Sequence, residues 1–257
     1  MNEGLMDKDI QTVYSHSYQL TAGECNAAGV MPVTLLVRRV IEVATEHANR
    51  LDIGYARLSQ QGIGWVLSRV SVEMGQWPGI NQEYTVTTWI ESFTRFYSDR
   101  CFAITDGAGN VIGHVRTMWV AIDIAARTVA DLTGIAQDYM LCRERQCPVP
   151  RQRKMRPVAP EQATRQNCYT FTYSDIDFNR HVNSVRYIDH ILDMWPMDFH
   201  DAHTLAAFEI AYQHECLYGQ PVSIVAAEQT DGDVTTAAVD IVRDGEVTVA
   251  AKLTFKR

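Results

Sequence analysis

The sequence predicts an α+β protein in which one structural unit occurs twice, each copy an antiparallel sheet wrapped around a long helix. In each half of the chain, a strand-like segment is followed by a helical segment and then by four more strand-like segments. The helical segments carry apolar residues along one face, and Asp-Gly or glycine-rich turns join several of the strands. The stretch between the halves has neither pattern. We therefore predict an N-terminal unit over residues 1–131, a linker over 132–163 and a C-terminal unit over 164–257.

The first half begins with a predicted strand over 13–21, and a helix then starts near Val33 and ends before Asp52. Pro32 suits the first position of that helix, because proline lacks the N–H that a helix start leaves unpaired. The predicted buried face consists of Leu36, Val37, Val40, Ala44 and Ala48. Strands are predicted over 63–74, 83–91, 97–105 and 111–124, with a glycine-rich hairpin turn at 106–110.

The predicted linker combines prolines with a run of basic residues. Prolines at 148, 150, 157 and 160 interrupt regular structure, and only 135–144 resembles a short helix. The basic residues of the run are Arg143, Arg145, Arg151, Arg153, Lys154 and Arg156, against the single acid Glu144. Such a run is usually a solvated linker, but it would also serve an acidic protein as a docking patch for an acidic partner.

The second half repeats the order of the first. A predicted strand over 168–173 precedes a polar loop, and a helix over about 184–195 ends before Pro196. Its apolar face consists of Val185, Ile188, Ile191, Leu192 and Trp195. Strands are predicted over 205–217, 222–230, 234–243 and 246–255, with Asp-Gly turns at 231–232 and 244–245.

The polar loop is the candidate site. Asp177, Asn179 and His181 are two residues apart, and alternate side chains of an extended segment share one face. A carboxylate, a carboxamide and an imidazole that converge in this way can orient a carbonyl group and activate water or a thiol. Asn183 matches a cap of the following helix. At the equivalent register, the first half has Cys25, Ala27 and Gly29. That copy is chemically blank and is available to form an apolar pocket.

The composition excludes several classes of function. A net charge of −8 argues against general nucleic-acid binding, and no apolar run is long enough for a membrane span. Residues 1–11 are polar and do not resemble a secretory signal. The six cysteines lack the paired spacings of a zinc site, so we expect free thiols in a reducing cytoplasm. No phosphate-binding loop is present, and no motif calls for a metal or another cofactor.

Three segments of the chain together resemble the acyl-acyl carrier protein (acyl-ACP) thioesterases, which are hydrolases built from two fused hot-dog units. The resemblance extends from about Tyr14 to the C-terminus. It rests on SDIDFNRHVN at 174–183 with VRYI at 185–188, on WVxxR at 65–69, and on Glu215-Cys216. The separation of His181 and Glu215 also agrees with the family pattern, whereas Ser184 stands where the plant motif usually has a second Asn.

The resemblance implies a double hot-dog fold and a thioester hydrolase that releases free fatty acid from acyl carrier protein in fatty acid synthesis. It implies Asp177, Asn179, His181 and Glu215 as site residues, with Cys216 as a further candidate nucleophile. Plant members carry an N-terminal plastid transit segment, and its absence here predicts a bacterial, cytoplasmic form.

Two other functions remain open from the sequence. A coenzyme A thioesterase would need the same site, because both carriers present a phosphopantetheine arm; the basic linker favours an acidic carrier protein. A non-catalytic acyl-thioester-binding protein would share the fold but would not need the complete polar set. Whether the double unit pairs again as a homodimer is also open.

The nucleophile has two candidate assignments. Cys216 attacks as a thiolate with His181 as base and Asn179 orienting the imidazole, or a carboxylate, Glu215 or Asp177, activates water. Adjacent residues of a strand point to opposite faces, so only one of Glu215 and Cys216 reaches His181. The even-numbered positions of 208–216 are mostly apolar. This pattern predicts a buried thiol at Cys216 and favours water as the nucleophile.

The acyl chain needs a dry pocket, which we place in the first unit between the helix over 33–48 and the strand over 63–74. Trp65, Val66 and Val70 are the candidate substrate-binding residues on that strand. Each buried methylene contributes about 0.8 kcal/mol, so the depth of the pocket sets the chain-length preference. We expect a larger residue at position 66 or 70 to shorten the preferred chain.

Overall fold

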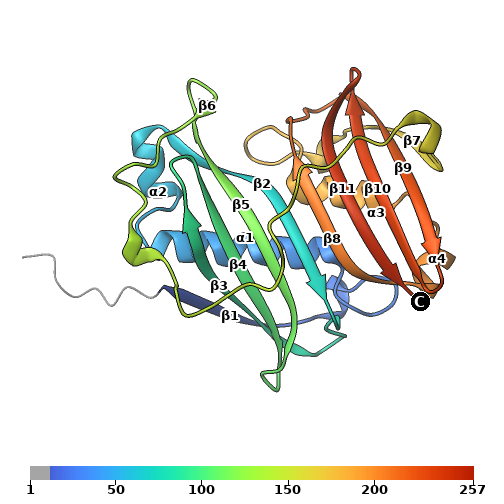
Figure 1. The fold of residues 1–257 in the computed structure, drawn as a ribbon, viewed down its shortest axis with the longest axis horizontal. Coiled ribbons are helices and arrows are strands. Elements are labelled where there is room, and N and C mark those ends of the chain that lie inside the picture. Colours follow the sequence, from blue (N-terminus) through green and yellow to red (C-terminus); the bar gives the residue numbers. More distant parts are fainter. Residues whose placement is uncertain (1–11) are drawn as a thin grey trace, which may run out of the picture.

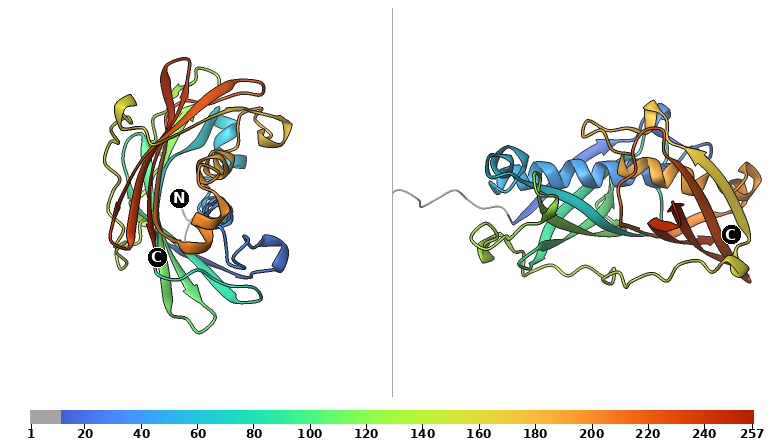
Figure 2. Two further views of the ribbon diagram at one scale, coloured as in Figure 1. Left: turned by 90° about the vertical axis from the view of Figure 1, so that its right-hand side faces the viewer. Right: turned by 90° about the horizontal axis from the view of Figure 1, so that it is seen from above.

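The computed structural model describes residues 12–257, which form one antiparallel sheet with helices on its concave face (Figures 1 and 2). The helices are α1 (Val33–Arg50), α2 (Tyr55–Leu58), α3 (Ser184–Leu192) and α4 (Met197–Ala202). The strands of the first half are β1 (Val13–Gln19), β2 (Ile63–Met74), β3 (Glu83–Phe93), β4 (Tyr97–Asp106), β5 (Val111–Asp123) and β6 (Thr128–Val129). Those of the second half are β7 (Arg165–Thr170), β8 (Thr204–Tyr212), β9 (Pro221–Asp231), β10 (Val234–Arg243) and β11 (Glu246–Lys256).

The strand order is β1-β3-β4-β5-β2-β8-β11-β10-β9-β7, with β6 paired to β5. The two halves are therefore not separate sheets: β2 pairs with β8 in antiparallel register from Arg69↔Ala211 to Glu73↔Ala207. The double hot-dog architecture predicted from the sequence is confirmed, and its two units share one continuous sheet.

The helix α1 forms where the sequence predicts it and buries the predicted face. Leu36, Val37 and Val40 have no exposed surface, and Ala44 and Ala48 are also buried. Pro32 differs slightly from the prediction, because it has extended backbone angles and caps the helix instead of forming its first turn.

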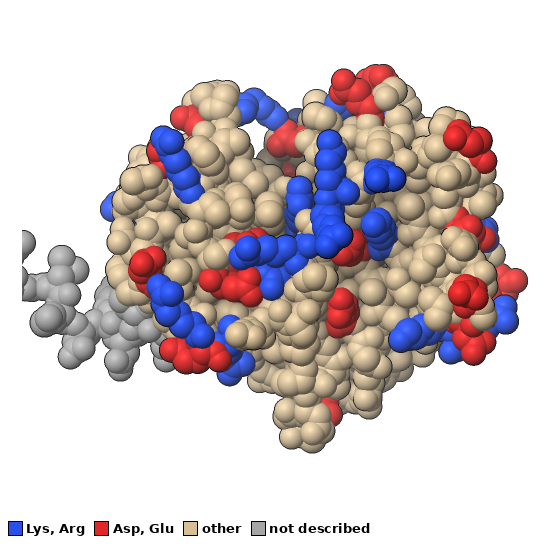
Figure 3. Space-filling view, viewed as in Figure 1, with Lys and Arg blue, Asp and Glu red and all other residues tan. Residues whose placement is uncertain are grey.

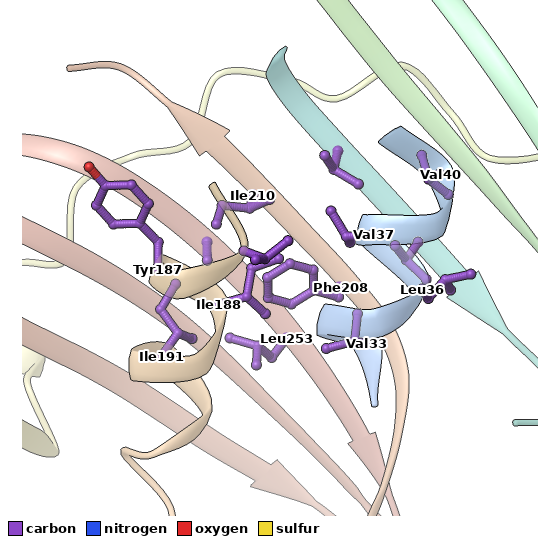
Figure 4. Close-up of a cluster of buried hydrophobic side chains, with 14 of the residues drawn as sticks. Val33, Leu36, Val37, Val40, Tyr187, Ile188, Ile191, Phe208, Ile210 and Leu253 are labelled. Atoms are coloured by element: carbon purple, nitrogen blue, oxygen red, sulfur yellow. The ribbon is translucent and has the colours of Figure 1, made fainter. Parts of the chain in front are cut away.

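The core lies where α1 and α3 meet above the central strands (Figure 4). Val37 of α1 and Ile188 of α3 pack in the same cluster as Phe208 and Ile210 of β8. All four side chains are fully buried, and burial of an apolar side chain of this size is worth about 1.5–3 kcal/mol. The core is thus common to both halves, which fixes the two units relative to each other.

Residues 132–163 cross the convex face of the sheet, opposite the helices (Figures 1 and 2). Side chains of the sheet hold this segment: Arg69 donates to the Gln152 carbonyl at 2.9 Å, Arg116 donates to the Val149 carbonyl at 2.7 Å, and the Val158 N–H donates to Asp240 at 2.6 Å. The helix expected over 135–144 is reduced to one 3₁₀ turn, Asp138–Met140.

The second half departs from the prediction at several element ends. The strand predicted over 168–173 lies three residues earlier, as β7. The helix α3 stops at Leu192, and Pro196 caps the additional helix α4, because proline is compatible with a helix start as well as with a helix end. The strand β8 ends at Tyr212, so Glu215 and Cys216 lie in the loop that follows it. Among residues 12–257, no helix is both long and apolar enough to span a membrane.

Candidate active site

The two halves together enclose a cavity of about 650 Å³. Its walls come from α1, the segment 53–58, and strands β2, β4 and β5 on the first-half side, and from the loops at 177–184 and 212–215 on the second-half side. Asp177, Asn179, His181 and Glu215 all line this one space. Residues that the sequence places in two distant segments are thus brought together.

The polar loop is a closed turn and not an extended segment. The Asp177 N–H donates to the His181 carbonyl at 2.8 Å, and its carboxylate accepts the N–H groups of Asn179 at 2.8 Å and His181 at 3.2 Å. Arg180 completes the turn with a φ of 70°. Convergence of the three side chains therefore comes from the turn and not from strand alternation. Because Asp177 bonds to two backbone N–H groups, it holds the loop in shape.

The imidazole of His181 faces the carboxylate of Glu215, with Nδ1 and Oε1 3.4 Å apart. Backbone pairing fixes this approach: His181 forms a β-bridge with Leu217, and the Val182 N–H donates to the Cys216 carbonyl at 2.9 Å. The Glu215 side chain is 40% exposed and the His181 side chain 26% exposed. Water can therefore reach both groups.

Cys216 lies on the opposite side of its loop from Glu215. It is fully buried, does not line the cavity, and donates its backbone N–H to the Tyr187 hydroxyl at 3.0 Å. Burial raises the pKa of that tyrosine, so the hydroxyl stays protonated. The predicted burial of the Cys216 thiol is confirmed, although the residue lies beyond the end of β8.

Arg127 is a site residue that the sequence did not indicate. It follows β5 in a tight turn, with a φ of 55°, and its guanidinium forms an ion pair with the Glu215 carboxylate. The contact joins residues 88 positions apart, from opposite halves of the chain. No local pattern marks an arginine in an exposed turn, so only the folded sheet identifies it.

Of the three predicted pocket residues, Trp65 and Val66 border the cavity and Val70 does not. The Trp65 indole donates to the Ile53 carbonyl at 2.8 Å and so joins β2 to the segment before α2. Neighbouring strand residues point to opposite faces, so Val66 points away from Trp65 and Leu67. A register shift between Leu67 and Arg69 then returns Val70 to the core, where it is fully buried.

The wall formed by the first half is not entirely apolar. Ser98 and Arg100 of β4 line the cavity and are 4% exposed each, which the expectation of a chemically blank first unit did not include. In the part of the chain that the structure describes, no three His, Cys, Asp or Glu side chains are grouped closely enough to hold a metal ion.

Most of the chain is similar to known acyl-ACP thioesterases. The family model of the acyl-ACP thioesterase N-terminal domain matches residues 11–139, and that of the C-terminal domain matches 158–257. A chloroplastic palmitoyl-acyl carrier protein thioesterase of Gossypium hirsutum is 23% identical over 79% of this chain and 52% of its own length. The chloroplastic oleoyl-acyl carrier protein thioesterase 2 of Arabidopsis thaliana is also 23% identical, over 87% of this chain and 65% of its own length. The chain thus spans about half to two thirds of these relatives.

Two solved structures cover nearly the whole chain. An acyl-ACP thioesterase from Bacteroides thetaiotaomicron superposes with a TM-score of 0.84, at 28% identity, over 95% of this chain and 98% of that one. The 12:0-ACP thioesterase from Umbellularia californica superposes with a TM-score of 0.82 at 17% identity, over 96% and 98% of the two chains, and is similar in fold.

Proposed function

The chain belongs to the acyl-ACP thioesterase family, and on that premise we propose that it hydrolyses acyl-acyl carrier protein to a free fatty acid and the carrier thiol. The observation that carries the proposal is the composition of the cavity. His181 and Glu215 lie within ion-pair distance at one wall of a space whose other walls include the apolar residues Ile41, Ala44 and Leu67. Such a space suits a polar thioester at one end and an acyl chain along the rest.

In the proposed reaction, Glu215 takes a proton from water while the water oxygen bonds to the thioester carbonyl carbon. The carbonyl oxygen becomes negatively charged, and the side-chain amide of Asn179 and the imidazole of His181 are the donors available to it. Collapse of the tetrahedral intermediate breaks the carbon–sulfur bond. The proton then passes from Glu215, directly or through His181, to the leaving sulfur.

The other two candidates have different roles in this proposal. Asp177 positions the loop, since its carboxylate already accepts the N–H groups of Asn179 and His181. Cys216 is a packing residue, since a fully buried thiol outside the cavity does not meet the substrate carbonyl. By the same reasoning, the unit over 1–131 supplies the acyl pocket and the unit over 164–257 supplies the catalytic groups.

The acidic carrier protein would dock on the basic linker. Lys and Arg side chains gather where the linker crosses the sheet (Figure 3). The six basic residues of the linker are all exposed: Arg143, Arg145, Arg151, Arg153, Lys154 and Arg156. Arg151 is already paired with Asp99 at 3.0 Å.

The test of this docking site therefore uses Arg153→Glu with Lys154→Glu. We expect kcat/KM for acyl carrier protein substrates to fall several-fold at low salt, with the loss shrinking at high salt and acyl-coenzyme A hydrolysis unchanged. An equal loss on both carriers would contradict this docking site.

The function itself is tested by steady-state hydrolysis of a panel of acyl thioesters on both carriers, for the wild type and Glu215→Gln. We expect turnover of acyl carrier protein substrates, reduced by roughly 10²–10⁴-fold in the variant. Higher kcat/KM on coenzyme A esters would assign the protein to that carrier instead. Tight binding of acyl thioesters without hydrolysis would make it a binding protein and overturn the proposal.

A further inference from the structure

The cavity contains polar groups that thioester hydrolysis does not use. Ser98 and Arg100 lie two residues apart on β4, so their side chains share one face of the strand about 7 Å apart. Both line the cavity, and both are 96% buried. A channel that received only a hydrocarbon chain would have no need of either group.

Arg100 contacts a histidine ring and a threonine hydroxyl. Its Nη1 lies 2.7 Å from the His47 ring nitrogen Nδ1 and donates to the Thr88 hydroxyl at 3.4 Å. No Asp or Glu of residues 12–257 forms an ion pair with it. Burial lowers the pKa of Arg100 to about 9, so it still carries its charge at neutral pH. Burial of such a charge is costly, and buried charges normally have an oppositely charged or strongly polar partner.

The Ser98 hydroxyl is a second, independent sign of a missing partner. Its Oγ is buried and has no hydrogen-bond partner among the residues that the structure describes. Buried polar groups are almost always hydrogen-bonded, so the partner of this hydroxyl is expected inside the cavity that it borders.

The position of these groups tells which part of a substrate they meet. In the sheet, β5 and β2 lie between β4 and β8, the strand that leads to Glu215. Three strand spacings amount to about 14 Å, since neighbouring strands are about 4.8 Å apart. Arg100 is also aligned in register with Thr117, Val70 and Ile210, whereas Glu215 follows Ile210 by five residues, so Arg100 is displaced from Glu215 both across the sheet and along the strands. Arg100 and Ser98 face the distal part of the acyl chain.

We propose that Arg100 and Ser98 select acyl chains that carry an oxygen, as a hydroxyl or keto group, on their distal part. The guanidinium donates a charge-assisted hydrogen bond to that oxygen, and the serine hydroxyl pairs with the same group. An unsubstituted chain offers no oxygen to the guanidinium and leaves the Ser98 hydroxyl unpaired, and this disfavours it. This inference rests on the proposed function for its substrate but concerns a different end of the cavity.

The test compares thioesters of equal chain length that are unsubstituted or carry a hydroxyl or keto group at successive distal positions. For the wild type we expect kcat/KM to be at least about tenfold higher for one oxygenated isomer than for the unsubstituted chain, as one hydrogen bond to a charged group supplies. In Arg100→Met this ratio should fall to about one, while hydrolysis of the unsubstituted chain is retained or rises. Equal ratios in the wild type and the variant would overturn the inference.

A second variant keeps the inference testable if Arg100→Met does not fold. Ser98→Ala removes one oxygen atom and should reduce the same ratio several-fold; Ser71→Ala, which changes a buried serine outside the cavity, is its control and should leave the ratio unchanged. A Ser98→Ala ratio equal to that of the wild type contradicts the role of Ser98.

A binding readout separates this inference from the proposed function. The oxygenated free acid should raise the thermal midpoint of the wild type more than the unsubstituted acid does, and Arg100→Met should abolish that difference. A preserved binding preference without hydrolysis would reject the proposed function and keep the inference. Hydrolysis of every chain without preference would do the reverse.

Discussion

At the scale of single residues, the site depends on how each polar group divides its hydrogen bonds between the backbone and the cavity. Asp177 uses its carboxylate on two backbone N–H groups, whereas the partners of the Glu215 carboxylate among residues 12–257 are the side chains of His181 and Arg127. A carboxylate bonded to the backbone is suited to shaping a loop. A carboxylate held by side chains beside a cavity can exchange a partner for a substrate, and this is why Glu215 is the stronger candidate base.

The nucleophile assignment gives a sharp prediction for Cys216→Ala. Turnover should stay within about threefold of the wild type, because the thiol does not border the cavity. Stability should fall by about 0.5–3 kcal/mol, the usual effect of a buried substitution. Urea unfolding and steady-state kinetics measure the two quantities, with Glu215→Gln as the inactive reference. Loss of turnover in Cys216→Ala at unchanged unfolding behaviour would restore the thiol as nucleophile.

The candidate site could be predicted in part from the sequence, for a physical reason. Asp177, Asn179 and His181 belong to one short segment, and local spacing is enough to bring them together. Glu215 needed a family resemblance, because its approach to His181 depends on pairing between two loops. Arg127 and Arg100 had no signal at all: each is a single arginine whose role follows from its place in the sheet.

At the scale of elements, most strands could be predicted because short polar or glycine-rich turns separate apolar runs. The strand β2 has the predicted bounds, and the predictions for β3, β4 and β5 differ from the structure by at most two residues at an end. The bulge within β2 could not be predicted, because Leu67 and Val70 read as parts of one buried strand. This bulge places Val70 on the same face as Leu67, where it is buried in the core and does not line the cavity.

The geometry of β2 and α1 moves the mutation expected to change the chain-length preference from β2 to α1. Ala48 lines the cavity from α1, so Ala48→Leu should shorten the preferred chain, at about 0.8 kcal/mol for each methylene that no longer fits. Val70→Leu is the control on β2: Val70 does not line the cavity, so the preference should not change. Hydrolysis rates over a series of chain lengths give the comparison. A shift in Val70→Leu with none in Ala48→Leu would reverse this assignment of the wall.

The segment over 132–163 packs across the sheet, and Asp240 is one of the sheet residues that bind it. Burial raises the pKa of Asp240, although the N–H bond from Val158 opposes the rise. A raised pKa in the folded state means that ionisation costs stability. The cost is absent below the unfolded value of about 3.8, grows as the pH rises from there, and is complete above the folded pKa.

Asp240→Asn should therefore be more stable than the wild type at pH 7, since asparagine keeps the acceptor for Val158 without the buried charge. The advantage should disappear near pH 3, where both side chains are neutral. Urea unfolding at a series of pH values measures it. If Asp240→Asn is instead less stable than the wild type at pH 7 and equally stable at pH 3, the hydrogen bond to the charged carboxylate contributes more free energy than its burial costs.

At the scale of the whole molecule, the two halves are joined in two ways that reinforce each other. The β2–β8 pairing makes one sheet, and α1 and α3 pack into one core cluster above it. The cavity lies across the same junction and takes its walls from both halves, with His181 and Glu215 on the second-half side. Neither half would form the site alone, so the site depends on the stability of the junction.

This coupling predicts a single unfolding transition, although chains of this length often unfold in steps. The tryptophans offer a direct measurement: Trp65, Trp77, Trp89 and Trp119 lie in the first half, and Trp195 alone lies in the second. Because the Trp77 indole donates to the Leu205 carbonyl of β8, Trp77 is replaced together with Trp195. In Trp77→Phe/Trp195→Phe, fluorescence reports only the first half while far-ultraviolet circular dichroism reports both. Because the core and the sheet are shared, the two signals should give the same midpoint in urea. An earlier fluorescence midpoint would show that the first half unfolds by itself, and the site would then be lost before the second half melts.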